Sequence, residues 1–287
     1  MKQLVQIKPA PKPHWVGDGF PVRSLISIDG DARQTSPFLM LDYARPHEFA
    51  PASAPRGVGG HPHRGFETVT IAYQGEVAHR DSSGNRGLIR PGDVQWMTAA
   101  SGVLHDEFHS EEFTREGGTF EMAQLWVNLP ARDKMRAPRY QSLLDAEIPA
   151  VALPDNAGRL RVIAGDYEGT RGPAATHTPM NVWDVRLNAA HGATFVLPEG
   201  WSTVLVVLHG EIEMDGRKVG PSDTAHFSRD GNSISVRATE NTIALLLSGE
   251  PIDEPIAHYG PFVMNTSEEL QKAVADFNDG RFGALRV

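Results

Sequence analysis

The sequence predicts an all-β protein built from two antiparallel barrels, and three observations lead to this prediction. Glycine and proline are abundant, with 28 and 21 of 287 residues, which is typical of many short strands joined by turns. Several segments are rich in β-branched and aromatic residues, as strands are. A strand–turn–strand unit around Gly75 recurs around Gly210, which indicates a duplicated fold.

Composition excludes several classes of function. The formal net charge of −9 argues against direct contact with nucleic acid, because a phosphate backbone requires a face rich in lysine and arginine. There is no cysteine, so disulfides and thiolate metal sites are excluded, and His, Asp and Glu remain as strong metal ligands. The N-terminus has no signal-peptide pattern, and no apolar run approaches the roughly 20 residues that span a bilayer. We therefore expect a cytoplasmic protein that does not enter a membrane.

The first half of the chain is a series of expected strands that end at turn residues. Residues 20–28 are expected to form a strand that stops at Asp29-Gly30, and a loop rich in proline and glycine at 50–60 leads to His61. Arg90-Pro-Gly-Asp93 is typical of a type II turn. Further strands are expected at 38–42, 67–73, 76–79, 94–98 and 120–128. Residues 131–141 are expected to connect the two halves.

The second half begins as strands and ends in a helix. Residues 160–164 and 182–187 are the clearest strand segments. Thr266-Ser-Glu-Glu269 is a capping-box pattern that precedes apolar residues at 270, 273, 274 and 277, which is helical spacing. We expect one amphipathic helix here, ending at Asn278-Asp-Gly280.

An internal repeat relates the two halves. The segment Gly65-Phe-Glu-Thr-Val-Thr-Ile-Ala-Tyr-Gln-Gly-Glu-Val matches Gly200-Trp-Ser-Thr-Val-Leu-Val-Val-Leu-His-Gly-Glu-Ile, and setting Gly75 on Gly210 gives an offset of 135 residues. Under this offset His61, His63 and Glu67 fall on Val196, Pro198 and Ser202. The second copy keeps the β pattern and lacks the ligands, so we expect one metal ion per chain.

The candidate site is formed by His61, His63 and Glu67 together with His105 and Glu107. Alternate side chains of a strand share a face, so His61 and His63 would point the same way, and so would His105 and Glu107. If the two strands are neighbours, three imidazoles and a carboxylate converge. Such a donor set suits a borderline divalent metal, with iron favoured over manganese, cobalt, nickel, copper or zinc. The same alternation of side chains along a strand would also direct Glu67 to this face.

The remaining histidines and the large aromatic residues have simpler explanations. His79 and His109 are isolated in polar stretches, and His226 and His258 lie in the half without a motif, so we expect these four imidazoles to be solvated. Trp96 and Trp126 lie in strand segments and are expected to pack inside the barrel.

Long motifs in this chain resemble those of the pirin family, within the cupin superfamily. The segments that resemble it are His61-Pro-His-Arg-Gly-Phe-Glu-Thr-Val-Thr70, Pro91-Gly-Asp-Val-Gln-Trp-Met-Thr-Ala99, Trp126-Val-Asn-Leu-Pro130, Gly249-Glu-Pro-Ile-Asp-Glu-Pro255 and Tyr259-Gly-Pro-Phe-Val-Met-Asn-Thr266. The resemblance implies a bicupin, with two antiparallel β-barrels (double-stranded β-helices) face to face and a short C-terminal helix. The expected domains are 1–135, which holds the metal, and 136–287, which lacks metal ligands.

The resemblance also implies the site residues. The family's metal ligands fall on His61, His63, His105 and Glu107. The general cupin pattern uses the Glu of the first motif as a ligand; here we expect Glu67 either to support a metal ligand or to act as a structural hydrogen-bond acceptor, and metal binding by Glu67 stays an alternative. The second general cupin motif is altered too, because His109 stands where an Asn is usual.

Two functions of different classes follow from the resemblance. One is a quercetin 2,3-dioxygenase, which opens a flavonol ring with O2 and releases carbon monoxide, with Fe(II) as the favoured metal and Glu107 as the general base. Its partners would be a small flavonol-like aromatic molecule and O2. The alternative is a regulatory protein whose metal oxidation state controls binding to a transcription factor or a metabolic enzyme. In either case we expect a monomer.

Overall fold

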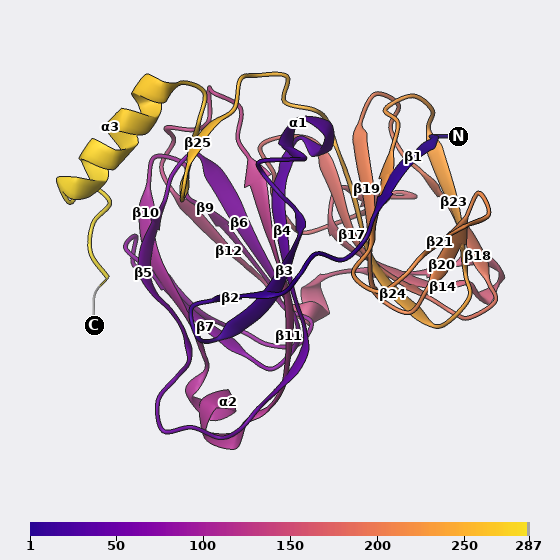
Figure 1. The fold of residues 1–287 in the computed structure, drawn as a ribbon, viewed down its shortest axis with the longest axis horizontal. Coiled ribbons are helices and arrows are strands. Elements are labelled where there is room, and N and C mark those ends of the chain that lie inside the picture. Colours follow the sequence, from indigo (N-terminus) through magenta and orange to yellow (C-terminus); the bar gives the residue numbers. More distant parts are fainter. Residues whose placement is uncertain (286–287) are drawn as a thin grey trace. The chain divides into compact units, whose positions relative to one another are not determined.

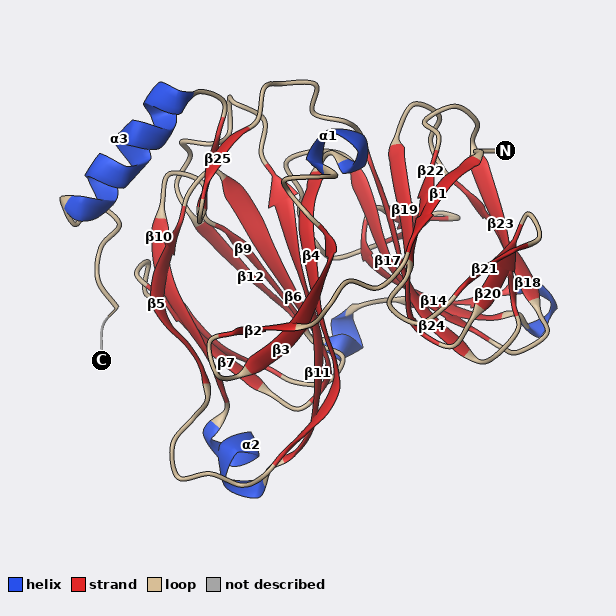
Figure 2. Cartoon of the chain, viewed as in Figure 1, coloured by secondary structure: helices blue, strands red, loops and turns tan. Residues whose placement is uncertain are grey.

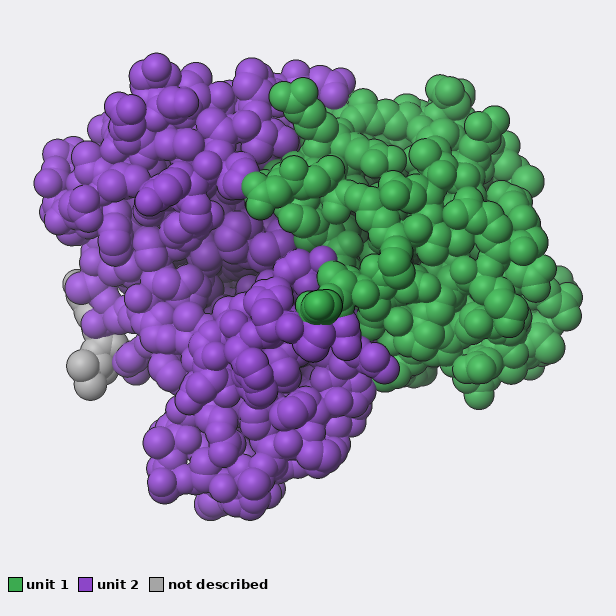
Figure 3. All heavy atoms as spheres, viewed as in Figure 1, with its two compact units in different colours: residues 1–12, 25–39, 146–251 green, residues 13–24, 40–145, 252–287 purple. Residues whose placement is uncertain are grey.

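The computed structural model describes residues 1–285, most of which lie in strands (Figures 1 and 2). The described chain forms two compact units, which have different colours in Figure 3. The N-terminal barrel contains residues 13–24, 40–145 and 252–285, and the C-terminal barrel contains residues 1–12, 25–39 and 146–251. Each unit holds two main antiparallel sheets around its own core, so the predicted all-β architecture of two barrels is confirmed.

The N-terminal barrel consists of a seven-stranded and a four-stranded sheet. The large sheet has the order β12 (Arg139–Leu143), β9 (Val94–Thr98), β6 (Phe66–Gln74), β11 (Gly118–Asn128), β4 (Phe38–Phe49), β3 (Phe20–Ile26) and β2 (His14–Val16). The small sheet has the order β5 (Gly57–His63), β10 (Val103–His109), β7 (Val77–Asp81) and β8 (Arg86–Ile89). Apolar side chains from both sheets, such as Phe20 and Met122 from the large one and Val77 and Ile89 from the small one, form one buried cluster between them.

The C-terminal barrel repeats this arrangement. Its large sheet has the order β1 (Leu4–Lys8), β22 (Thr224–Phe227), β19 (Ser202–His209), β24 (Thr242–Gly249), β17 (Met180–Leu187), β14 (Gly158–Ala164) and β13 (Ala150–Leu153). Its small sheet has the order β18 (Gly192–Val196), β23 (Ser233–Ala238), β20 (Ile212–Met214) and β21 (Arg217–Val219). The strand β19 occupies the place of β6, and β18 occupies the place of β5. The internal repeat seen in the sequence is therefore a structural repeat.

Short helices and hairpins complete the described chain. The helices are α1 (Ala32–Thr35), α2 (Glu111–Glu116) and α3 (Ser267–Asn278), with 3-10 turns at Asp145–Glu147 and Pro154–Asn156, and the hairpins are β15 (Asp166–Tyr167) with β16 (Thr170–Arg171) and β25 (Ala257–Tyr259) with β26 (Phe262–Met264). The predicted C-terminal helix is confirmed, including its capping box between Thr266 and Glu269. Among residues 1–285, no helix combines the length and hydropathy that crossing a membrane requires.

The two units do not divide at residue 135 as predicted. Strand β1 pairs with β22, and Leu4 and Ile7 pack against the core of the C-terminal barrel, so the chain's first residues belong to the later unit. Residues 252–285 belong to the N-terminal barrel, where Ala273 of α3 and Phe282 pack with Phe262. Pairing between segments that are distant in the sequence decides both assignments, and local patterns do not encode it.

Candidate metal centre

The predicted ligands lie on two adjacent strands of the small sheet. Strands β5 and β10 are antiparallel, with His105 opposite His61 and Val103 opposite His63. Between His105 and Glu107 the register shifts, so that Glu107 faces Val58 and the Gly59-Gly60 pair forms a bulge. On the other side of β10, His105 lies opposite Asp81 and Glu107 opposite His79 on β7.

Three imidazoles converge at this point. The ring centroids of His61 and His105 are 4.2 Å apart, those of His63 and His105 are 4.7 Å apart, and those of His61 and His63 are 4.9 Å apart. One ring nitrogen from each of these residues lies within 4.8 Å of the other two, which is a spacing that a metal ion could bridge. A second group, His79, His105 and Glu107, meets the same limit and shares His105 with the first.

The protonation of these rings suits a metal. The Nδ1 atom of His61 lies 3.0 Å from the carbonyl oxygen of Gly59, which assigns the proton to Nδ1 and leaves the lone pair of Nε2 free. Burial, reinforced by the His61 imidazole, holds the pKa of His63 well below its ordinary value, and burial with the His63 imidazole does the same for the pKa of His105. The buried rings of His63 and His105 are therefore available in the neutral form that binds metals.

The carboxylate of Glu107 is held by the opposite sheet. The Nε2 atom of Gln124, on β11, lies 3.0 Å from each oxygen of Glu107, and the Thr70 hydroxyl, on β6, lies 3.3 Å from Oε1. Glu107 is buried, and these donors fix its orientation inside the barrel. The site thus lies between the two sheets of the N-terminal barrel.

An unpaired ring nitrogen and the types of donor atom both support the fit of a metal to this group. The buried Nε2 atom of His105 has no hydrogen-bond partner among the described residues, and a buried ring nitrogen without a partner is rare. Imidazole nitrogens with one carboxylate are the donors that iron, nickel, copper and zinc accept. The residues present therefore fit a divalent transition metal, which could be held by members of both overlapping groups.

His79 contradicts the prediction that it is solvated. It is only 3 % exposed, its Nδ1 atom lies 3.4 Å from Nδ1 of His105, and its ring stacks on Tyr140 with centroids 5.3 Å apart. Its Nε2 atom lies 3.6 Å from the carboxylate of Asp81. His79 was missed because its burial depends on the register of β7 against β10, which no local signal encodes.

His109 and His226 are also buried, although both were expected to be solvated. The Nε2 atom of His109 lies 3.0 Å from the carbonyl oxygen of Gly19, and its ring stacks on Phe120 with centroids 4.8 Å apart. In the C-terminal barrel, the Nε2 atom of His226 lies 2.9 Å from the Thr224 hydroxyl, and burial lowers the pKa of His226 to about 4. Each imidazole packs within its own barrel.

Glu67 points away from the imidazole cluster. Strand β5 ends at His63 and β6 begins at Phe66, so the shared parity of His61, His63 and Glu67 is broken by the intervening turn. Thr70 faces Glu107, and in a regular strand Glu67 therefore lies on the opposite face. Its Oε1 atom accepts a hydrogen bond of 2.6 Å from Thr98, in agreement with the expected structural role.

The turn between β5 and β6 explains the rest of the motif. Gly65 has a φ of +89°, and a Cβ there would lie 1.9 Å from the carbonyl oxygen of Val263, so only glycine fits. Arg64 donates to Asp276 of α3 at 2.8 Å and to the Ser101 carbonyl oxygen at 2.7 Å. These contacts fix the chain directly after His63, and with it the position of the His63 ring.

The large sheet presents further polar groups to the barrel interior. Thr68, Gln95 and Trp126 pair with or lie beside Thr70 and share its face, and the Thr68 hydroxyl, the Gln95 amide and the Trp126 Nε1 atom are buried without hydrogen-bond partners among residues 1–285. The Trp126 ring lies between Phe66 and His63, with centroid distances of 4.3 Å and 5.4 Å, so its predicted packing role is confirmed. Groups of this kind can be satisfied by water or by a polar ligand in the interior.

The C-terminal barrel lacks this chemistry at the equivalent place. Val196 is 73 % exposed, and Pro198 is also exposed. Under the offset of 135 residues, Thr70 corresponds to Leu205, and the partner of Leu205 on β24 is Leu246, where Thr70 has Gln124. The residues that hold Glu107 are thus replaced by two buried leucines.

Comparisons with known proteins agree with this description. A family model described as Pirin matches residues 19–127, and one described as Pirin C-terminal cupin domain matches residues 182–283. A Pseudomonas aeruginosa protein named "Putative quercetin 2,3-dioxygenase" is 56 % identical over 98 % of this chain and 99 % of its own length. A "Pirin-like protein" of Solanum lycopersicum is 38 % identical over 94 % of this chain and 89 % of its own.

Solved structures match the fold closely. A crystal structure titled quercetin 2,3-dioxygenase, from Acinetobacter baumannii, has a TM-score of 0.97 and 51 % identity, and the match covers 100 % of both chains. A bacterial pirin from Escherichia coli in complex with nickel(II) has a TM-score of 0.65 and 20 % identity, over 86 % of this chain and 99 % of that chain, and shows the fold alone.

Proposed function

The chain belongs to the pirin family and has the bicupin fold, and we propose that it is a metal-dependent dioxygenase that opens the ring of a flavonol with O2 and releases carbon monoxide. The observation that carries the proposal is the convergence of three imidazoles inside one barrel, where one of them, His105, also lies beside His79 and the buried carboxylate of Glu107. Relatives whose names contain quercetin 2,3-dioxygenase support the reaction class.

The proposed ligands are His61, His63, His105 and Glu107, with Fe(II) as the favoured metal. Nickel, manganese, cobalt, copper and zinc accept the same donors. His61, through its Nε2 atom, and the buried rings of His63 and His105 supply three nitrogens. A bound divalent ion would act as a Lewis acid that lowers the pKa of the substrate hydroxyl and leaves room for substrate and O2.

Glu107 is proposed as the general base. Its two oxygens accept hydrogen bonds from Gln124, and Thr70 adds a third, so the carboxylate is held at one place in the barrel interior. A hydroxyl that approaches the imidazole cluster would meet this carboxylate, and one of its oxygens would take the proton. Gln124 and Thr70 act as positioning residues, because they orient the base without touching the substrate.

The polar groups of the large sheet are proposed to orient the substrate. The indole Nε1–H of Trp126 is a donor for a ring carbonyl, while the Gln95 amide and the Thr68 hydroxyl can donate to or accept from a flavonol hydroxyl. Their burial without protein partners motivates this assignment. Binding such a flat, polyhydroxylated molecule would satisfy donors and acceptors that otherwise lack partners.

The decisive experiment combines metal content and turnover on one sample. Protein stripped with a chelator is loaded with Fe(II) without oxygen, its metal is measured by elemental analysis, and quercetin is added under air. We expect one metal ion per chain, loss of the flavonol absorbance and release of carbon monoxide. Unchanged absorbance, with a known flavonol dioxygenase clearing quercetin in parallel, would exclude the reaction and leave the redox-dependent regulatory function as the next to test.

Matched variants assign the residues. His61→Ala is expected to lose the metal, whereas Glu107→Gln is expected to keep the fold and lose most of the turnover. His226→Gln, which alters a buried imidazole of the C-terminal barrel, serves as the control and should retain both metal and turnover. If Glu107→Gln turns over quercetin at the original rate, the base is another residue.

A further inference from the structure

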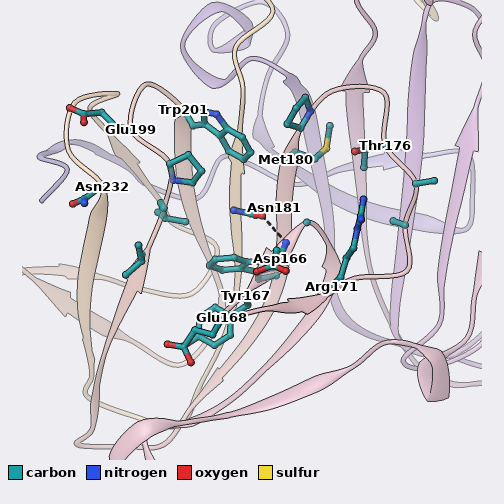
Figure 4. Close-up of a pocket in the computed structure, with 18 of the residues that line it drawn as sticks. Asp166, Tyr167, Glu168, Arg171, Thr176, Met180, Asn181, Glu199, Trp201 and Asn232 are labelled. Carbon is teal, nitrogen blue, oxygen red and sulfur yellow. Dashed lines mark hydrogen bonds between the residues drawn. The ribbon is translucent and has the colours of Figure 1, made fainter.

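The C-terminal barrel contains a large cavity at the place where the N-terminal barrel has its imidazole cluster. The cavity measures about 1290 Å³ and is lined by residues between β15 and β17, by the end of β18 and the loop after it, and by Asn232 (Figure 4). Its lining includes Val196 and Pro198, which correspond to His61 and His63 under the offset of 135 residues. The duplicated barrel has therefore kept an opening at this place while losing every ligand of the motif.

The cavity has aromatic walls. Tyr167 is 4 % exposed and Trp183 is 1 % exposed, and their rings meet edge to face with centroids 5.2 Å apart. Trp201, half-buried, and Met180 line the cavity as well (Figure 4). Walls of this composition favour a flat aromatic ligand, since rings bury large area in stacked and edge-to-face contacts.

Two buried donors point to an oxygen atom on the ligand. The Nε1–H group of Trp183 is buried and has no hydrogen-bond partner within residues 1–285. The Oδ1 atom of Asn181, which is 6 % exposed, accepts a hydrogen bond of 3.2 Å from the backbone N–H of Asp166, so its Nδ2 group remains as a donor (Figure 4). A carbonyl or phenolic oxygen is the acceptor that would satisfy both groups.

The charges at the cavity select against anions. Exposed carboxylates of Asp166, Glu168 and Glu199 line it, against one guanidinium, that of Arg171. An excess of negative charge disfavours phosphates and polycarboxylates. The ligand is therefore expected to carry no negative charge.

From these observations we propose that the C-terminal barrel is a second ligand site, independent of metal, that binds an uncharged planar aromatic ketone of flavonoid size. Trp183 and Asn181 hold the ketone oxygen at the buried end, and Trp201 stacks on the exposed part of the ring system. The site requires neither a metal nor turnover in the N-terminal barrel. Ligand binding here can therefore be tested independently of the dioxygenase reaction.

The test uses flavone, a planar aromatic ketone without the hydroxyl groups of a flavonol, and metal-free protein. The chain has 5 tryptophans, so the indole N–H signals in a ¹H–¹⁵N NMR spectrum are few and can be assigned with single Trp→Phe variants. We expect flavone to shift the Trp183 and Trp201 signals saturably. Signals of Trp183 and Trp201 that stay in place, or that move without saturation, would overturn the proposal.

Variants separate the two barrels. Trp183→Phe keeps the ring and removes the N–H group, and Trp201→Ala removes the stacking surface, so each is expected to weaken flavone binding about tenfold. Trp126→Phe, in the N-terminal barrel, should leave the shift of the Trp201 signal unchanged. If Trp183→Phe fails to fold, Trp201→Ala still tests the proposal, because Trp201 is only half-buried and its replacement should disturb the core less. If Trp201→Ala binds flavone with unaltered affinity, flavone binds elsewhere. The same conclusion would follow if flavone no longer shifted the Trp201 signal in Trp126→Phe.

Discussion

Replacing Glu67 by glutamine is expected to change how the stability of the N-terminal barrel depends on pH. Glu67 is fully buried, its Oε1 atom accepts a hydrogen bond from Thr98, and the Trp96 side chain also lowers its pKa. Burial raises the pKa of this carboxyl from an ordinary 4.5 to about 7, although Thr98 opposes the change. The folded protein therefore holds a proton here that the unfolded chain has already released.

The sign and size of the effect follow from this difference in pKa. Between pH 4.5 and about 7 the folded state binds more protons than the unfolded state, so stability falls as the pH rises through this window and stays low above it. Each pKa unit corresponds to ~1.4 kcal/mol, which gives a loss of about 3 kcal/mol for the whole window. Glutamine cannot ionise and keeps an oxygen for Thr98, so Glu67→Gln should be nearly neutral at pH 5 and stabilising by about 3 kcal/mol at pH 8.

The assay is unfolding by urea at pH 5, 6, 7 and 8, followed for both proteins by the fluorescence of the N-terminal tryptophans in a background with Trp183 and Trp201 replaced by Phe. Taking the difference between the two proteins cancels other groups that titrate in the same range. Thr98→Val provides a second test, because loss of the hydroxyl donor should steepen the pH dependence. A difference that is constant from pH 5 to 8 would refute the reasoning. Metal titration of Glu67→Gln should give unchanged affinity, and a loss like that of His61→Ala would make Glu67 a ligand.

Three further predictions concern residues around the site and the C-terminal helix. His79→Ala is expected to weaken metal binding about 10- to 100-fold, because the His79 ring orients the adjacent His105 ring. Calorimetric titration of the metal-free protein measures this affinity. An unchanged affinity would show that His79 does not support the site. Lys134→Met should cost about 3 kcal/mol in urea unfolding, because three buried oxygens lose the Nζ donor within 3.0 Å, and equal stability would contradict that bonding. Thr266→Ala should cost about 1 kcal/mol and lower the Tm, while Thr266→Ser should retain most of the stability, since only the latter preserves the cap.

The sequence predicted those features that depend on local patterns. The period of two within a strand placed His61 with His63 and His105 with Glu107; in the structure His61 and His63 meet His105, and Glu107 lies beside His105 and His79. The capping box at Thr266 and helical spacing predicted α3 because both signals lie within a few residues of each other. The shared pattern around Gly75 and Gly210 predicted the duplication, since it required only a comparison of the chain with itself.

Features that depend on long-range pairing were not predictable in this way. Glu67 does not share the face of His61 and His63, because the turn at Arg64 and Gly65 moves the chain from the small sheet to the large one. His79 was expected in solvent because its burial follows from the β7–β10 register. The assignment of β1 to the C-terminal barrel depends on its ladder with β22, which joins residues more than 200 positions apart.

The duplication accounts for both the metal centre and the cavity. In the N-terminal barrel, Thr70 and Gln124 form a pair across β6 and β11 that can hold a buried carboxylate. In the C-terminal barrel the same pair is Leu205 and Leu246, which can stabilise no charge. Histidines restored at positions 196 and 198 would therefore still lack a supported carboxylate.

The Trp126 indole in the N-terminal barrel is replaced by a smaller side chain in the C-terminal barrel. Trp126, opposite Thr68 on β6, corresponds to Ser248, opposite Thr203 on β19, and the two hydroxyls lie 3.1 Å apart. Exchanging an indole for a hydroxymethyl group removes the side chain that packs against His63 in the first barrel. One barrel thus has a supported carboxylate and imidazoles that could hold a metal, whereas in the other the loss of polar support and of a large ring together favour an uncharged organic ligand.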